Sequence, residues 1–457
     1  MPNDPVPDLL ARATKMLEGE FGSLPDFDAA SDTARNPEAM ARVLDTVAHR
    51  LGNNYPYFHP LYAGQMLKPP HPVARAAYAL AMVLNPNNHA RDGGRASSEM
   101  EIEAVAHIAG MFGWTEFLGH LTSGGTQANL EALWVAGQLA PGRRIVGSEQ
   151  AHYTHQRISS VLKLEYASIA ADRRGRMDME ALESELRKGD VSTVVVTLGT
   201  TAIGAVDPLD QVVALRRRYG FRIHVDAAYG GYFRLISDAL DSPARAAYAA
   251  LDQADSIVVD PHKHGLQPYG CGSILFRDPA VGRFYKHDSP YTYFTSKELH
   301  LGEISLECSR AGATAVALWA TQQLLPLTPG GEFAQGLACG RAAALELDRR
   351  LRLDPRFEPL TAGAPELDIV VWKLNAASPE QSSHLAHKVF LACATVDLHL
   401  ALVQLPVAWF EPAGAGTAES AQEYVTCLRS VLMKPEHEAW LDRIWEKLIA
   451  ACAKAEG

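Results

Sequence analysis

The stretch Arg222-Ile-His-Val-Asp-Ala-Ala-Tyr-Gly-Gly231 carries the clearest indication of the fold of this 457-residue chain. Its first half is rich in apolar and β-branched residues, which predicts a short buried strand that ends on the carboxylate of Asp226. Similar runs at 193–197, 256–260 and 272–276 alternate with helical patterns. Short apolar strands separated by helices are typical of a mostly parallel sheet with both faces covered.

Outside this predicted strand, the sequence pattern divides the chain into three parts. Residues 1–90 are predicted to form an N-terminal arm with helical and aromatic segments, and residues 91–330 a large α/β domain. The cluster Pro326-Leu-Thr-Pro-Gly-Gly331 marks a joint. Residues 331–457 are predicted to form a smaller C-terminal α+β domain, with strands near 369–374 and 398–403 and a closing helix.

Composition restricts the partners. The 42 Lys and Arg residues against 53 Asp and Glu give a net charge of −11, so no electrostatic reason favours nucleic acid or an anionic membrane. The six cysteines are dispersed without a C-x-x-C pair. The N-terminus lacks a basic start followed by an apolar run, and the longest uncharged stretch, 311–331, contains Pro, Gly and Gln. We therefore expect a cytoplasmic protein.

Polar residues gather where the predicted strands end, which is where open parallel sheets bind ligands. Ser123, Gly124 and Gly125 lead directly into a helical pattern, and free N–H groups at such a helix start can cradle a phosphate. An ordinary glycine turn is the alternative. Asp226 is flanked by alanines and glycines, so it can meet a flat ligand, although a helix N-cap would use the same residue.

Two further residues complete this set. Lys263, in Asp260-Pro-His-Lys-His264, follows an apolar strand, and partial desolvation favours the neutral amine that forms imines with carbonyls. His152 offers an imidazole that can stack on a planar ligand, or one that is simply hydrogen-bonded. Together the four positions fit a ligand with a phosphate, a basic aromatic nitrogen and an aldehyde. Pyridoxal 5′-phosphate (PLP) has all three, with Lys263 forming the Schiff base and Asp226 keeping the ring nitrogen protonated.

The order of these motifs resembles the group II PLP-dependent amino acid decarboxylases, which belong to the aspartate aminotransferase-like fold type I superfamily. The motifs that carry the resemblance are Thr122-Ser-Gly-Gly-Thr-Gln-Ala-Asn129, Ala151-His152, Leu198-Gly-Thr-Thr201, His224-Val-Asp-Ala-Ala228 and Asp260-Pro-His-Lys263. Lys263-His-Gly-Leu-Gln-Pro268, Asp288-Ser-Pro-Tyr291 and Ser309-Arg-Ala-Gly312 are most similar to the short tyrosine/aspartate decarboxylases. Sphingosine-phosphate lyases share the Lys-x-Gly-x-x-Pro pattern.

The resemblance implies a role for each motif residue. Lys263 would carry the cofactor as an internal aldimine, Asp226 would pair with the pyridinium, and His152 would stack on the ring opposite Ala228. The phosphate and the ring edge would be held by Ser123, Gly124, Gly125, His262 and Thr200 or Thr201. A homodimer with the active site at the subunit interface is implied, with Tyr291 or Tyr293 on a mobile loop as the acid that protonates the carbanion.

The expected reaction is decarboxylation of an L-amino acid to an amine and carbon dioxide. Candidate substrate-binding residues are Tyr57, His59, Tyr62, Asn88 and Arg310. Clustered aromatic residues favour an aromatic substrate such as tyrosine, although core and dimer packing would account for them as well. Arg310 could bind the side-chain carboxylate of aspartate, glutamate or cysteate, hold the α-carboxylate of any substrate, or form a structural ion pair. Other PLP reactions (retro-aldol cleavage, aldehyde synthesis, carbon–carbon bond formation) share these residues. A zinc hydrolase with His152, His155, His262, His264 and Asp226 as metal ligands is a further alternative, although the spacing lacks H-E-x-x-H.

Overall fold

The computed structural model describes residues 4–25, 36–286, 301–360, 363–410 and 423–456. Its larger sheet has seven strands in the order β1-β7-β6-β5-β4-β2-β3. The β7 strand runs antiparallel to β1 and β6, and the other neighbouring strands pair in parallel. This confirms the predicted fold class. The strands are β1 (Leu118–Thr122), β2 (Arg144–Ser148), β3 (Tyr166–Ile169), β4 (Val191–Thr197), β5 (Arg222–Asp226), β6 (Ser256–Val259) and β7 (Gly272–Phe276).

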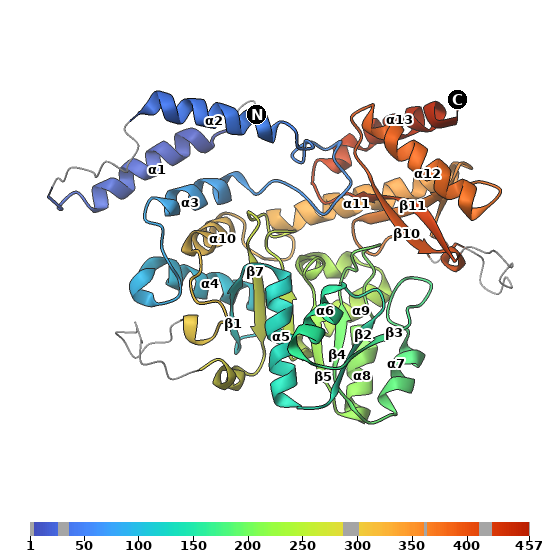
Figure 1. Cartoon of the computed structure of the whole chain (residues 1–457), viewed down its shortest axis with the longest axis horizontal. Coiled ribbons are helices and arrows are strands. Elements are labelled where there is room, and N and C mark those ends of the chain that lie inside the picture. The colour runs from blue at the N-terminus through green and yellow to red at the C-terminus, as the bar shows by residue number, and fades with distance from the viewer. Residues whose placement is uncertain (1–3, 26–35, 287–300, 361–362, 411–422, 457) are drawn as a thin grey trace.

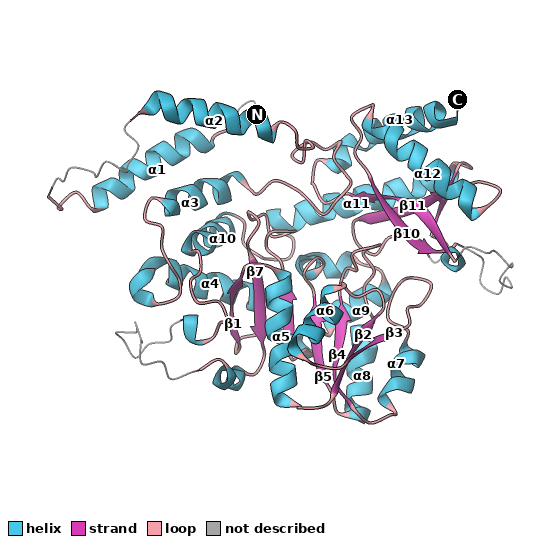
Figure 2. Ribbon diagram, in the orientation of Figure 1, coloured by secondary structure: helices cyan, strands magenta, loops and turns pink. Residues whose placement is uncertain are grey.

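Helices cover both faces of this sheet (Figures 1 and 2). On β4, Val195 packs with the helices of one face, while Val194 and Val196 join the core on the other. This alternation explains why the strands read as continuous apolar runs. One face is covered by α5 (Gly125–Leu139) and α6 (Thr154–Leu162). The other carries α4 (Arg95–Met111), α7 (Met179–Leu186), α8 (Leu209–Tyr219), α9 (Ser242–Ala249) and α10 (Gly312–Leu324).

A second, antiparallel sheet has the order β10-β11-β9-β8 and a core of its own. The predicted strand near 398–403 begins only at Ala401, because Asp397 has a positive φ of 63° and His399 pairs with the N-terminal arm instead. The strands are β8 (Phe357–Pro359), β9 (Ile369–Leu374), β10 (Ala401–Pro406) and β11 (Tyr424–Val431). The helices are α11 (Glu332–Leu353), α12 (Pro379–Ala394) and α13 (His437–Glu456).

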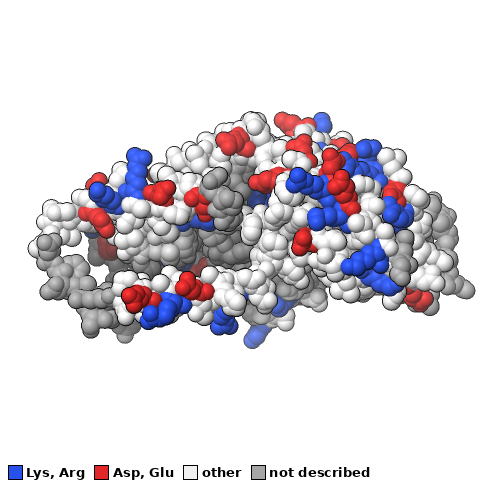
Figure 3. All heavy atoms as spheres, turned by 90° about the horizontal axis from the view of Figure 1, so that it is seen from above, with Lys and Arg blue, Asp and Glu red and all other residues white. Residues whose placement is uncertain are grey.

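The N-terminal arm contains α1 (Val6–Glu20), α2 (Pro37–Leu51) and α3 (Pro72–Met82), and it runs along the upper edge of the molecule in Figure 1. No residue of α1 or α2 is buried. The domain limits at residues 90 and 330 stay predictions. Within the described residues, no helix is long and apolar enough to span a membrane. Figure 3 shows Lys and Arg intermixed with Asp and Glu on the face seen there.

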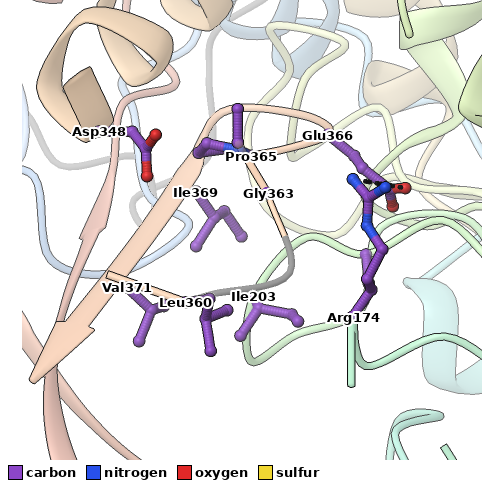
Figure 4. Close-up of a pocket in the computed structure, with 11 residues that line it drawn as sticks. Arg174, Ile203, Asp348, Leu360, Gly363, Pro365, Glu366, Ile369 and Val371 are labelled. Carbon is purple, nitrogen blue, oxygen red and sulfur yellow. Dashed lines mark ion pairs between the residues drawn. The ribbon is translucent and has the colours of Figure 1, made fainter. Parts of the chain in front are cut away.

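The loops that follow β3 and β4 meet the segment that leads into β9 at a small hollow beside Arg174 and Glu366 (Figure 4). The Arg174 guanidinium lies 3.7 Å from Glu366 Oε1, and Glu366 Oε2 accepts the backbone N–H of Val206 at 2.6 Å. The hollow measures about 40 Å³. That volume is too small for a cofactor, so this contact joins the two parts of the chain without forming a ligand site.

Candidate active site

A cavity of about 360 Å³ opens at the carboxyl ends of β4, β5 and β6, beside the start of α5. This is the size range of small-molecule sites and the expected edge of the sheet. Nine of the residues singled out in the sequence line it: Ser123, Gly124, Gly125, His152, Thr201, Asp226, Ala228, His262 and Lys263. The parallel strands bring these residues together from positions up to 140 places apart in the chain.

The turn between β1 and α5 forms the wall of the cavity at the N-terminus of α5. Gly124 has a φ of 155°, a conformation that L side chains rarely adopt. A Cβ at Gly125 would lie 2.7 Å from Asp260 Oδ2, so only glycine leaves this space open. The Ser123 N–H already donates to a carboxylate, that of Glu307, at 3.1 Å. The turn therefore offers small residues and N–H groups where an anion can approach.

Asp226 ends β5 and is only 4% exposed. Its Oδ2 accepts hydrogen bonds from His155 Nε2 at 2.8 Å and from Asn129 Nδ2 at 3.2 Å, and its Oδ1 accepts the Ala228 N–H at 3.1 Å. Burial opposes ionisation, but the His155 hydrogen bond and the nearby charge of Lys263 outweigh it. They hold the pKa of Asp226 well below its usual range. The cavity thus presents a buried anion.

Lys263 lies one turn beyond the end of β6. Its Nζ is 3.1 Å from Asp260 Oδ2, and His262 Nε2 is 3.5 Å from the same oxygen. Burial lowers the pKa of His262. The buried His262 Nδ1 has no hydrogen-bond partner within the described part of the chain, so this nitrogen is free to meet a ligand.

His152 and the threonines of 198–201 complete the cavity wall. His152 Nδ1 is 2.8 Å from Thr154 Oγ1, and burial lowers the pKa of His152. Of the two candidate threonines, Thr201 lines the cavity. Thr200 is fully buried and its hydroxyl accepts the Ala205 N–H at 3.0 Å, which ties it to its own loop.

The candidate substrate-binding residues lie outside the lining of this cavity. Tyr57 and Tyr62 pack edge-to-face at 4.9 Å, and His59 packs on Trp440 at 4.8 Å. Asn88 is fully buried and donates to Glu101 Oε2 at 2.6 Å.

Arg310 is also engaged elsewhere. Its Nη1 donates to Glu101 Oε1 at 2.6 Å and to the Leu121 carbonyl at 2.8 Å. The structure thus uses this guanidinium in a buried ion pair. The two candidate acids, Tyr291 and Tyr293, lie outside the described residues.

Four residues approach the site although the sequence analysis gave them no role in binding PLP. His155 and Asn129 bond to Asp226, and His224 Nε2 bonds to Asn129 Oδ1 at 2.8 Å. Arg429 of β11 is 5% exposed and donates to the carbonyl of the cavity residue Thr201 at 2.8 Å. Asn129 and His224 belong to the motifs 122–129 and 224–228, so the sequence offered a signal for them. Nothing in the spacing of the sequence indicates that His155 or Arg429 lies near the cavity.

The donor set fits PLP. An amine, a buried anion, an imidazole and a glycine turn at a helix start converge on one cavity of suitable volume, and Gly125 leaves room beside Asp260. The buried, unpartnered His262 Nδ1 adds a polar atom that a ligand would satisfy. The fold and this cavity together define a PLP-binding enzyme of fold type I.

Comparisons with known proteins agree. The sequence model of the pyridoxal-dependent decarboxylase conserved domain matches residues 134–372, more than half of the chain. The L-tyrosine decarboxylase of Enterococcus faecium is 26% identical over 94% of this chain and 90% of its own length. A probable L-tyrosine/L-aspartate decarboxylase of Methanothermobacter thermautotrophicus is 28% identical over 70% of this chain and 84% of its own length.

The fold is shared with solved structures. The crystal structure of Oryza sativa TDC with PLP and tryptamine has a TM-score of 0.76 and 18% identity, and the match covers 99% of each chain. The chain belongs to the pyridoxal-dependent decarboxylase family. It is a PLP-dependent amino acid decarboxylase, as the order of its motifs predicted.

Proposed function

We propose that this enzyme decarboxylates an aromatic L-amino acid, with tyrosine as the first candidate, to the corresponding amine and carbon dioxide. The observation that carries the proposal is the convergence of Lys263, Asp226 and the turn at Gly125 on one cavity. The L-tyrosine decarboxylase of Enterococcus faecium, similar over almost the whole chain, supports tyrosine as the substrate.

The cavity residues have distinct proposed roles. Lys263 holds PLP covalently through its amine, and Asp226 faces the ring nitrogen and keeps it protonated. His152 and Ala228 enclose the ring, while Ser123, Gly124, Gly125 and His262 bind the phosphate. When bound, PLP supplies an electron sink for the electron pair that stays on the α-carbon when carbon dioxide leaves. Tyr291 and Tyr293 remain the predicted acids.

Substrate is proposed to enter beside the arm segment 62–65. Arg429 links this segment to the cavity, because it donates to the Thr201 carbonyl at 2.8 Å and to the Gly64 carbonyl at 3.4 Å. Tyr55, Tyr57 and Tyr62 pack together next to that loop, with ring centroids 4.9 to 6.3 Å apart. An aromatic surrounding of this kind suits an aromatic side chain.

An acidic substrate is the second candidate. A relative named as a probable L-tyrosine/L-aspartate decarboxylase supports it. The guanidinium of Arg310, the predicted partner of a side-chain carboxylate, is already paired with Glu101. That pairing favours the aromatic candidate.

Carbon dioxide release from the purified holoenzyme tests the proposal. L-Tyrosine, L-phenylalanine, L-tryptophan, L-aspartate, L-glutamate and L-cysteate would be supplied separately, and the amine product identified by mass. We expect the highest kcat/KM with L-tyrosine. Preference for L-aspartate would establish the second candidate. An aldehyde released together with carbon dioxide would overturn the amine as the product. A cleaved side chain without carbon dioxide would overturn decarboxylation of these substrates altogether.

We further propose a homodimer that buries the arm. The α1 and α2 helices expose large apolar residues although they bury none: Leu9, Met16, Met40, Val43, Leu44, Val47 and Leu51. A second copy of the chain would cover such a surface. Light scattering should give twice the chain mass, and Val43→Asp combined with Leu44→Asp should give monomers. A wild-type monomer would contradict the dimer. The cytoplasmic location stays a prediction from the sequence.

A further inference from the structure

A fully buried histidine lies behind the Asp226 carboxylate. His155 is the second residue of α6, and its Nε2 is 2.8 Å from Asp226 Oδ2. Its Nδ1 is buried and finds no partner among the described residues. Because a carboxylate oxygen only accepts, the Nε2 must carry the hydrogen and donate it to Asp226. The neighbouring His152 lines the cavity, whereas His155 lies outside its lining.

A second donor reaches the same oxygen through a directed chain of hydrogen bonds. Burial lowers the pKa of His224 to about 3, so its ring is neutral and carries one N–H. Its Nε2 donates to Asn129 Oδ1 at 2.8 Å, and its Nδ1 accepts from Ser256 Oγ at 2.9 Å. Asn129 Nδ2 then donates to Asp226 Oδ2 at 3.2 Å. All three hydrogen bonds therefore run in the same direction, each donor pointing toward Asp226.

These bonds fix how the carboxylate can face a ligand. Oδ2 takes two side-chain donors and Oδ1 takes the Ala228 N–H. A carboxylate offers about four acceptor directions, so one direction remains for a donor in the cavity that Asp226 lines. A buried carboxylate with three donors is held as an anion and cannot rotate without breaking them.

We propose that His155 is a positioning residue, whose Nε2 hydrogen bond orients Asp226 as an anion toward the ring nitrogen of PLP. The inference rests on the proposed role of Asp226. His155 itself touches neither cofactor nor substrate in this assignment. Loss of its bond would leave Asp226 with Asn129 and the backbone, free to turn away from the ring nitrogen.

Replacement of His155 by two residues of similar bulk tests the assignment. His155→Leu removes the donor, and His155→Gln keeps an N–H that can reach Asp226. We expect the Kd for PLP of the apoprotein, measured by fluorescence, to rise roughly 10- to 100-fold in His155→Leu. We expect kcat to fall with KM for the substrate little changed, and His155→Gln to recover part of both losses. His387→Gln, an exposed histidine on α12, is the control and should match wild type.

Two outcomes would overturn the inference. One is a folded His155→Leu with wild-type Kd for PLP and wild-type kcat. The other is a His155→Gln that is as impaired as His155→Leu. Should His155→Leu fail to fold, nitrogen-15 spectra of histidine-labelled wild type decide instead. The imidazole N–H signal that is absent in His155→Gln should shift when PLP is added, and an unchanged signal refutes the inference.

Asp226→Ala, measured in parallel, separates this inference from the proposed function. If PLP binding and turnover are impaired in Asp226→Ala but normal in His155→Leu, only the His155 assignment is rejected. Normal PLP binding and turnover in Asp226→Ala would reject the role of Asp226, and the His155 assignment with it.

Discussion

Arg310 and Glu101 form a buried ion pair, with Arg310 Nη1 2.6 Å from Glu101 Oε1 and side chains only 7% and 2% exposed. The pair joins the segment before α10 to the middle of α4, and the Leu121 carbonyl at the end of β1 accepts from the same guanidinium nitrogen. The cation thus holds the β1 end in place beside the turn that opens the cavity.

Arg310→Met should therefore destabilise the protein. Removing one partner leaves Glu101 buried without its cation, which typically costs about 3–5 kcal/mol. Urea unfolding should show this loss, whereas Arg349→Met, which breaks an exposed pair with Glu346, should cost no more than about 1 kcal/mol. Unchanged stability together with a raised KM for the substrate would instead indicate that Arg310 binds substrate.

Gly125→Ala should weaken PLP binding while the fold is retained. The added Cβ would lie 2.7 Å from Asp260 Oδ2, at the helix start proposed to hold the phosphate. We expect the Kd for PLP to rise by about 10-fold or more, since a displaced helix start loses hydrogen bonds to a charged group. The matched control is Gly110→Ala within α4, where nothing lies within 4 Å of the new Cβ. Equal Kd values in the two variants would contradict the proposed phosphate site.

Lys263→Ala should abolish covalent retention of PLP. Borohydride reduction of the wild-type holoenzyme, followed by denaturation and mass spectrometry, should leave PLP attached to the peptide that contains Lys263. The variant should release all of its cofactor after the same treatment. Lys188→Ala, which removes an exposed lysine paired with Glu185, should behave as wild type. Labelling of another lysine in the wild-type protein would refute the assignment.

Acid should destabilise the fold partly through two buried histidines. Burial lowers the pKa of both His224 and His437 to about 3. Between that pH and the unfolded value near 6.5, the unfolded chain binds protons that the folded chain does not. The stabilisation is therefore complete above about pH 6.5 and is lost as the pH falls toward 3.

His437→Gln isolates one of these contributions. Over that interval, the free energy of unfolding of the variant should depend on pH less steeply than that of wild type, by up to roughly 1.4 kcal/mol per pH unit. Other buried groups titrate in the same interval, so the measured quantity is the difference between the two proteins. The exposed His384→Gln should keep the wild-type slope. An identical slope in His437→Gln would show that His437 is not held neutral.

Much of the site followed from local sequence. A run such as Arg222–Asp226 can be buried on both faces only within a covered sheet, and the carboxyl ends of parallel strands share one edge. The residues directly after strands, Asp226 and Lys263 among them, therefore had to converge. The places of Gly124 and His152 in the cavity lining were predictable for the same reason.

Two pairings needed the tertiary structure. Arg310 and Glu101 are 209 residues apart, and nothing in the spacing of charged residues says whether a guanidinium meets a substrate or another side chain. The same holds for His155 and Asp226, which are 71 residues apart. Sequence alone determined the sheet, its ligand-binding edge and the family, because short-range periodicity and motif order encode them. Only the packing of α4 and α6 against the sheet decided which buried polar groups pair, since desolvation forces each to find whatever partner lies within hydrogen-bond distance.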